Sequence, residues 1–425
     1  MTSVLIKNTQ VIVANNDLVR QDVLVVDGII KKVAANISKT TDRVIDAKGA
    51  LITPGLVDVH VHFREPGFAY KETVATGSRA AARGGFTTVL AMPNLDPVPD
   101  TLSNFQMIQA NNDMNSLVHL YQYAAISADL TTEDVSDIGA LAEAGAVGFT
   151  NDGKGVQTAA TMLAAMKAAA KAQRPLVAHV EDNSLINGGV MNLGKRSKEL
   201  NLPGMDPLGE SSQLARDLVL AKATGVHYHV AHLSTKESVE LVRIAKSQGV
   251  NVTAEVSPHH LLLDETHITG DNAYFKMNPP LRTPTDRAAV IAGLLDGTID
   301  MVATDHAPHS LAEKEGSFIG AAFGITGIET SFQLLYTHLV KSGIATLSQL
   351  LNWMVIQPQQ AFDLTGTNAI VAGQPADLAL FDIEHTHKIT ADEFASKGVN
   401  TPFIGATIYG QTLLTMVDGQ IVYEL

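Results

Sequence analysis

Positions 57–62 read VDVHVH, a short apolar run that carries two histidines and is the most informative segment of this chain. Successive side chains of a β-strand point to opposite faces, so His60 and His62 are predicted to project to the same side. Two imidazoles held in this way can bind one metal ion. The pattern is short, and two incidental histidines on a strand explain it about equally well.

Further apolar runs of the chain also end in a side chain that can bind a metal ion. These side chains are Asp152, which precedes a glycine turn, His179, His232 and Asp305. Each alone is more often structural than catalytic, but five strand ends that present His or Asp are hard to explain by chance. Imidazoles and carboxylates suit Zn²⁺, so the sequence predicts a metal centre.

The middle of the chain alternates between short apolar runs and alanine-rich stretches. Strands are predicted at 87–91, 146–150, 175–180, 226–233, 250–256 and 300–304, and helices at 158–173, 211–223 and 235–247. Such alternation is typical of parallel βαβ units, in a closed barrel or an open doubly wound sheet. No G-x-G-x-x-G follows the first strand, which disfavours dinucleotide binding. In a (β/α)8 barrel, active sites form at the C-terminal strand ends, where the predicted ligands lie.

The two ends of the chain carry the same hairpin signature. Runs 23–26 and 29–33 flank Asp27-Gly28, and runs 413–417 and 420–423 flank Asp418-Gly419. Asp-Gly suits the tight turns of hairpins. We predict one small β domain built from segments 1–53 and 366–425 around a barrel at 54–365; two unrelated edge hairpins are the alternative.

Composition narrows the classes of function. The formal net charge is -14, and no basic stripe offsets it, which argues against nucleic-acid binding. An anionic substrate would need local cations, such as metal ions or arginines. There are no cysteines, so a metal site must use His, Asp or Glu. The start of the sequence lacks a secretion signal and no apolar run could span a bilayer, so a cytoplasmic location is expected.

Four longer motifs make the resemblance to a known family specific. They are DVHVHFREPG at 58–67, AMPN at 91–94, NPPLR at 278–282 and ATDHAPH at 303–309. With them the chain resembles the dihydroorotases of the long bacterial class, in the amidohydrolase superfamily, over essentially its whole length. The resemblance implies a (β/α)8 TIM barrel with a small β-sandwich domain formed by the N- and C-terminal segments.

The resemblance also implies two zinc ions and their ligands. One zinc is held by His60, His62 and Asp305, the other by His179 and His232, and Asp152 bridges them. Many related enzymes use a carboxylated lysine as the bridge. Lys154 lies near enough to raise that option, but Gly153 is expected to end the strand and leave Lys154 in a loop. The shorter acid is expected to leave the second site partly occupied.

A further group of residues is implied to contact substrate. These are His62, Arg64, Asn94, Asn278, His309 and the backbone around Phe323 and Gly324. A guanidinium can grip a carboxylate in bidentate fashion, which suits Arg64. The alternatives are a turn-capping role for Asn94 and an ordinary loop position for His309. Strand parity predicts that His227 and His229 face away from His232.

The implied reaction is the reversible, zinc-dependent cyclisation of N-carbamoyl-L-aspartate to dihydroorotate plus water, in pyrimidine (UMP) biosynthesis. Asp305 would act as general base and then general acid. The alternatives are another cyclic amidohydrolase (a dihydropyrimidinase, hydantoinase or allantoinase) and a non-catalytic partner subunit. The family includes homodimers and complexes with aspartate transcarbamoylase, so either assembly is possible.

Overall fold

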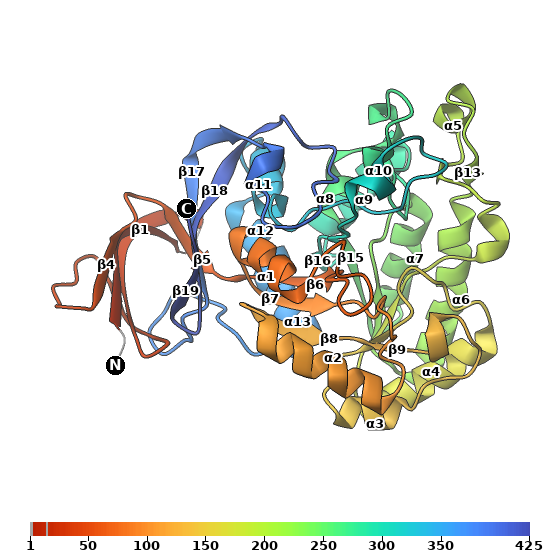
Figure 1. The fold of residues 1–425 in the computed structure, drawn as a ribbon, viewed down its shortest axis with the longest axis horizontal. Coiled ribbons are helices and arrows are strands. Elements are labelled where there is room, and N and C mark those ends of the chain that lie inside the picture. The colour runs from red at the N-terminus through yellow and green to blue at the C-terminus, as the bar shows by residue number, and fades with distance from the viewer. Residues whose placement is uncertain (1–2, 14–15) are drawn as a thin grey trace.

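The computed structural model describes residues 3–13 and 16–425, so four positions of the predicted 1–53 segment lie outside the described residues. Figure 1 shows two parts: a barrel wrapped by helices, and a small sheet domain beside it that contains both chain ends. None of the described helices is both long and apolar enough to cross a membrane.

The barrel consists of parallel strands in chain order. They are β6 (Leu56–Val61), β7 (Phe86–Ala91), β8 (His119–Gln122) continued by β9 (Ala124–Ala125), β10 (Phe149–Thr150), β11 (Leu176–Ala178), β14 (Tyr228–Val230), β15 (Val252–Val256) and β16 (Met301–Val302). A parallel bridge between Val61 and His306 joins the last strand to the first. The His62 amide donates to the His306 carbonyl at 2.9 Å. The sheet is therefore closed, and the open doubly wound alternative is wrong.

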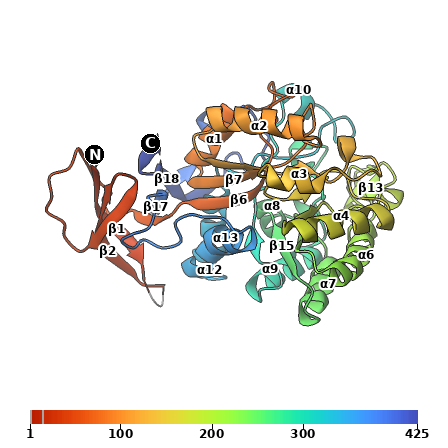
Figure 2. The same cartoon turned by 90° about the horizontal axis from the view of Figure 1, so that it is seen from below.

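Helices surround the barrel, as Figure 2 shows from below. The main ones are α1 (Val74–Arg83), α2 (Leu102–Asn115), α3 (Ile138–Glu143), α4 (Ala159–Ala172), α6 (Leu208–Thr224), α7 (Lys236–Ser247) and α9 (Pro284–Leu295). Most begin at a threonine whose hydroxyl accepts a backbone amide of the first turn, as Thr158 and Thr235 do. Such a cap satisfies a donor that the helix leaves free and contributes about 1 kcal/mol.

Two apolar layers hold the barrel together. Outward-facing side chains such as Phe149 and Tyr228 pack beneath the helices, and inward-facing ones such as Val57, Leu90 and Phe362 fill the barrel. Burial of each large side chain contributes roughly 1.5–3 kcal/mol. The inner apolar layer fills the part of the barrel away from the C-terminal strand ends, so those ends remain available for polar groups.

The predicted helices are confirmed to within three residues at each end, whereas several strands are shorter than predicted. The run 226–233 is an example, because β14 covers only Tyr228–Val230. Its chain leaves the strand conformation by His232, whose φ is +34°. Apolar composition does not reveal such a backbone change, so the strand predicted from the sequence continued to residue 233.

The small domain is one sheet shared by both ends of the chain. Its strands are β1 (Ser3–Ile12), β2 (Leu18–Val26), β3 (Ile29–Ala34), β4 (Arg43–Asp46), β5 (Leu51–Pro54), β17 (Leu378–Lys388), β18 (Thr407–Val417) and β19 (Gln420–Glu424), in the order β19-β18-β17-β5-β1-β2-β3 with β4 beside β1. β5 pairs antiparallel with β17, which joins the two ends. Both predicted hairpins are present. The boundaries 53/54 and 365/366 stay predictions.

The two Asp-Gly turns pack against each other. Gly28 and Gly419 have φ of +76° and +77°, and a Cβ added to Gly419 would lie 2.6 Å from the Gly28 Cα. The Ala376 amide donates to the Gly28 carbonyl at 2.7 Å, and the Gly419 amide donates to the Ala376 carbonyl at 3.1 Å. Glycine is required here both for its backbone conformation and for the close approach.

Candidate metal centre and substrate cavity

The six side chains predicted to bind metal converge at one mouth of the barrel. They come from the C-terminal ends of five strands: His60 and His62 from β6, Asp152 after β10, His179 after β11, His232 after β14 and Asp305 after β16. Each is at most 7% exposed. Residues separated by up to about 245 positions thus meet in one buried cluster, as parallel strands of a barrel allow.

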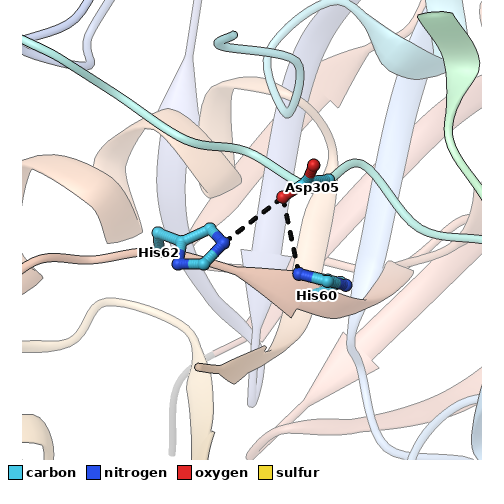
Figure 3. A group of neighbouring side chains, drawn as sticks. All are labelled: His60, His62 and Asp305. Atoms are coloured by element: carbon cyan, nitrogen blue, oxygen red, sulfur yellow. Dashed lines mark ion pairs between the residues drawn. The ribbon is translucent and has the colours of Figure 1, made fainter. Parts of the chain in front are cut away.

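The first group joins β6 to the end of β16. The Nε2 atoms of His60 and His62 lie 3.4 and 3.3 Å from Asp305 Oδ1 (Figure 3). The same two nitrogens lie 3.4 and 3.5 Å from the carboxylate oxygens of Asp152. Ligand atoms about 2.0–2.1 Å from a tetrahedral zinc are about 3.4 Å apart, so these separations suit one ion.

The second group joins β11 to β14. His232 Nε2 and His179 Nδ1 lie 3.5 and 3.8 Å from Asp152 Oδ1, and the two nitrogens are 2.9 Å apart. Asp152 therefore reaches the imidazoles of both groups. Such a position suits a bridging carboxylate, because a shared anion reduces the repulsion between two dications.

The residues present fit a divalent cation. His60 Nε2 and Asp152 Oδ1 are buried and have no hydrogen-bond partner. A buried polar atom without a partner costs roughly 1–3 kcal/mol, which coordination to a cation would remove. The donors are nitrogen and oxygen atoms only, as Zn²⁺ sites without cysteine require.

The two carboxylates of the cluster differ in their proton affinity. Burial raises the pKa of Asp305 to about 7, and the neighbouring carboxylates of Asp152 and Glu255 act in the same direction. Burial also acts to raise the pKa of Asp152, but the imidazoles of His60 and His232 outweigh it and hold that pKa well below its usual range. Two neighbouring acids with such different pKa values are typical of sites in which one acid binds the metal ion and the other transfers protons.

Three residues at this mouth have left-handed backbone conformations. The φ angles are +60° at Arg64, +34° at His232 and +48° at Asp305. Residues with a Cβ adopt such angles at a cost of about 1–3 kcal/mol, and they concentrate at functional sites. The surrounding fold therefore holds these side chains in place at some cost in stability.

A cavity of about 180 Å³ opens beside the metal-binding cluster. Its lining includes Arg64, Asn94, Asn278, Phe323 and Gly324 together with five of the six residues of the cluster, all except His60. A larger cavity of about 590 Å³ lies between β1 and α12 (Leu347–Leu351), but no ionisable side chain lines it. Ligand sites combine a hollow with a few convergent polar groups, so the smaller cavity is the candidate substrate site.

Arg64 supplies a cation to this cavity. Its Nε is buried and has no hydrogen-bond partner, and its Nη2 lies 3.5 Å from His309 Nε2. His309 stands behind the cavity lining, where its Nε2 is 2.7 Å from the Phe323 carbonyl oxygen. The free Nε of the guanidinium suits a carboxylate. His309 Nε2 donates to the Phe323 carbonyl and therefore cannot also accept from Arg64.

The two predicted asparagines already hold protein partners. Asn94 Nδ2 donates to the Asp152 carbonyl at 2.6 Å, and Asn278 Nδ2 donates to Glu181 Oε2 at 2.7 Å. Each amide carries two hydrogens, so one remains for a ligand at Asn94, whereas Asn278 Nδ2 also lies 3.4 Å from His179 Nε2. The prediction from sequence placed these residues at the cavity but did not foresee that they also join its walls.

Sequence reasoning missed two acidic residues at the centre. Glu181 Oε2 lies 3.5 Å from His179 Nε2, and Glu255 Oε1 lies 2.6 Å from His60 Nδ1. Glu255 stands in the apolar run 250–256, and a charged residue within a buried parallel strand is itself a signal of a specific partner. Glu181, two residues after His179, offers a weaker signal.

The prediction that His229 faces away from His232 is wrong. His229 points into the barrel, and its Nε2 lies 3.1 Å from Glu255 Oε2, whose other oxygen accepts the His232 amide at 3.2 Å. Strand alternation fails here because the left-handed backbone at His232 interrupts the parity count. Lys154 is exposed in the turn after Asp152, as predicted.

Comparison with known proteins agrees with this architecture. The family model described as "Dihydro-orotase-like" matches residues 49–238. Dihydroorotases of Ligilactobacillus salivarius and Enterococcus faecalis are 56% and 54% identical, each over 99% of this chain and 98% of that protein. The solved L-hydantoinase of Arthrobacter aurescens superposes with a TM-score of 0.88 at 26% identity, covering 100% of this chain and 96% of its own. The dihydropyrimidinase of Brevibacillus agri shares the fold, with a TM-score of 0.85 at 20% identity, covering 100% and 95%. With more than half of its residues identical to full-length relatives, the chain belongs to the dihydroorotase family.

Proposed function

We propose that this chain is the enzyme that interconverts N-carbamoyl-L-aspartate and dihydroorotate in pyrimidine biosynthesis. One observation carries the assignment: relatives 53–56% identical over nearly their whole length are dihydroorotases. The site has the parts that this chemistry needs, because a buried cluster of side chains able to bind metal borders a cavity lined by Arg64, whose Nε has no hydrogen-bond partner.

The metal content that we propose is two zinc ions. His60, His62 and Asp305 would hold the first, His179 and His232 would hold the second, and Asp152 would be shared between them. When bound, such ions polarise the reacting carbonyl group and lower the pKa of a bound water toward about 7. Partial occupancy of the second site is part of the proposal, because a short aspartate replaces the longer lysine bridge of related enzymes.

Substrate orientation falls to the residues around the cavity. Arg64 grips the carboxylate that stays outside the ring, the second amide hydrogen of Asn94 donates to the substrate, and Asn278 lines the same cavity. His309 Nε2 donates to the Phe323 carbonyl and helps to fix the backbone that borders the cavity. The net charge of -14 repels anions at long range, so this local cation is important for binding. A fixed orientation brings the ureido nitrogen and the side-chain carboxyl carbon into reach of each other.

Asp305 carries the proton in both directions. In hydrolysis it accepts a proton from the attacking water and delivers it to the ring nitrogen as the carbon–nitrogen bond breaks. In cyclisation the order reverses: the ionised carboxylate takes a proton from the ureido nitrogen as the carbon–nitrogen bond forms, then gives it to the oxygen that departs as water from the protonated side-chain carboxyl of the substrate. A carboxyl group whose pKa is raised to about 7 by burial can serve in both protonation states near neutral pH.

Substrate comparison tests the proposal. Purified zinc-loaded protein is incubated with dihydroorotate, dihydrouracil, hydantoin and allantoin, and ring opening is followed by absorbance and chromatography. Turnover of dihydroorotate is expected to exceed the others by at least about 100-fold, since a site built for a charged group rejects substrates that lack it. Preference for hydantoin or dihydrouracil would instead identify a hydantoinase or dihydropyrimidinase. Absence of both metal and turnover would favour a non-catalytic partner subunit.

Assembly and location are further parts of the proposal. We expect a cytoplasmic enzyme that forms a homodimer or binds aspartate transcarbamoylase, whose product it would use. Light scattering of the purified protein, alone and mixed with the transcarbamoylase, distinguishes the two assemblies. A monomer in both samples would refute this part and leave the catalytic assignment intact.

A further inference from the structure

Glu255 is a carboxylate buried inside the barrel, on β15, with 1% of its surface exposed. Its contacts are to residues of the cluster and to one further histidine. Oε1 lies 2.6 Å from His60 Nδ1 and accepts the His232 amide at 3.2 Å, and Oε2 lies 3.1 Å from His229 Nε2. A buried charge is costly unless it is fully hydrogen-bonded, so the Glu255 carboxylate depends on these three contacts. The role of Glu255 follows from the residues that it contacts.

The chemistry of a carboxylate fixes the direction of these hydrogen bonds. An ionised carboxylate only accepts, so His60 must carry its proton on Nδ1. The lone pair of His60 is then on Nε2, the atom that faces Asp152 and Asp305 and has no hydrogen-bond partner. Glu255 therefore selects the one neutral form of His60 that can bind a metal ion from this side.

A chain of hydrogen bonds beyond Glu255 has the same direction. His229 donates from Nε2 to Glu255, so its Nδ1 accepts from the Thr253 hydroxyl at 2.7 Å. The Thr253 oxygen in turn accepts from His227 Nε2 at 2.8 Å. Every donor in this chain points toward Glu255, so the surroundings hold its carboxylate in one orientation.

The contact with the His232 amide extends the influence of Glu255 to the second group of ligands. His232 has a left-handed backbone with φ of +34°, and its amide hydrogen bond to Oε1 helps to hold that conformation. The same oxygen contacts the His60 ring. One carboxylate oxygen thus ties a residue of the first metal group to a residue of the second.

We propose that Glu255 is the positioning residue of the metal centre, which sets the protonated nitrogen of His60 and the spacing between His60 and His232. The inference rests on the proposed metal-dependent function and extends it to a residue that contacts neither metal nor substrate. Carboxylates that orient histidine ligands commonly change metal affinity or activity about 10–100-fold when they are mutated.

Glu255→Gln is the test variant. Glutamine has the same shape, but one end of its amide is a donor and meets either His60 Nδ1–H or His229 Nε2–H. Asp217→Asn is the matched control. Asp217 on α6 is also buried, and its oxygens accept from the Tyr228 hydroxyl at 2.9 Å and from Arg216 at 2.8 Å, away from the cluster.

Three measurements are compared in the wild type and both variants: zinc affinity by chelator competition, the visible spectrum of the Co²⁺-loaded protein, and kcat with KM. For Glu255→Gln we expect zinc affinity to fall about 10-fold, the Co²⁺ bands to shift, and kcat to fall with little change in KM. Asp217→Asn is expected to keep the affinity, spectrum and kcat of the wild type.

Wild-type zinc affinity and an unshifted Co²⁺ spectrum in Glu255→Gln would overturn the inference, as would equal losses in Asp217→Asn. If Glu255→Gln does not fold, Thr253→Val is the second test variant. It removes the hydroxyl that donates to His229, the histidine that in turn donates to Glu255. Weaker metal binding is then expected, and unchanged binding counts against the proposal. Wild-type protein that binds no metal would refute the proposed function itself, which keeps the two failures distinct.

Discussion

Asp152 and Asp305 both lie 3.4 Å from His60 Nε2, yet their surroundings give them different proton affinities. The pKa of Asp152 is held well below its usual range by the imidazoles around it, which suits a permanently charged ligand. Burial raises the pKa of Asp305 to about 7, which suits a group that exchanges protons near neutral pH. The difference in proton affinity between the two carboxylates is therefore set by their neighbours and not by residue type.

Replacement of Asp305 by asparagine tests this division at the reacting atoms. The amide has almost the same shape but cannot accept and return a proton, so kcat is expected to fall by at least about 100-fold. Dihydroorotate binding, measured by calorimetry, should remain detectable. Metal content is determined in parallel, and near-normal turnover in this variant would refute the proton-transfer role.

Arg64→Met tests the carboxylate grip. The variant keeps an unbranched side chain but loses a charge-assisted contact worth roughly 1.5–3 kcal/mol, so kcat/KM should fall about 10–100-fold, mainly through KM. Steady-state kinetics with dihydroorotate provide the measurement. Arg79→Met, on the exposed face of α1, is the control and should behave as wild type. An unchanged KM in Arg64→Met would exclude this contact.

At the scale of elements, the segment after β16, residues 303–324, closes one side of the cavity. Two buried lysines, Lys314 within it and Lys276, hold its backbone in place. Lys314, in α10 (Leu311–Lys314), donates from Nζ to the carbonyls of Lys276, Ala322 and Gly324 at 3.1, 2.9 and 3.0 Å. Lys276 Nζ lies 4.3 Å from the centre of the Phe323 ring. Carbonyl dipoles from this segment stabilise these ammonium groups, and in return the lysines fix the backbone at Phe323–Gly324.

Lys314→Met should loosen this segment. The variant leaves the Ala322 carbonyl without a donor, whereas the carbonyls of Lys276 and Gly324 keep the Gly324 amide and Asn400 Nδ2 as donors. Stability is therefore expected to fall by about 1–3 kcal/mol and KM to rise more than kcat falls. Hydrogen exchange of residues 318–324, followed by mass spectrometry, reports the local change. Lys195→Met, at an exposed lysine of α5 (Lys195–Glu199), is the control. Equal exchange in the two variants would show that Lys314 does not hold the segment.

At the scale of the whole molecule, the candidate metal centre connects five strands of the barrel. An ion bound there stabilises the folded state by about 4 kcal/mol when its free concentration is a thousand times its dissociation constant. Chelation is therefore expected to lower the midpoint of thermal unfolding by several degrees, as measured by calorimetry. His60→Ala, which removes one ligand, should contain less zinc and respond less to the chelator. An equal response in both proteins would argue against His60 as a ligand.

Local patterns in the sequence were sufficient for much of this architecture. Asp-Gly pairs indicated both hairpins, and the alternation of apolar runs with alanine-rich stretches indicated parallel βαβ units. His and Asp residues at the ends of the apolar runs indicated the cluster from His60 to Asp305. The longer motifs indicated the family. What local patterns did not reveal depends on tertiary contacts: Glu255 acquires its role only because folding brings it to His60, 195 positions away. Likewise, His229 and His232 both face the barrel interior because of a backbone angle at His232 that no residue type encodes.

The pairing of β5 with β17 has a consequence for synthesis. Residues 51–54 leave the ribosome more than 300 residues before their partners 378–381. During this time one edge of β5 has no native neighbour, and such edges recruit other strands. A nascent chain released early would keep this edge open, so prematurely terminated products are expected to aggregate or to be removed by proteases.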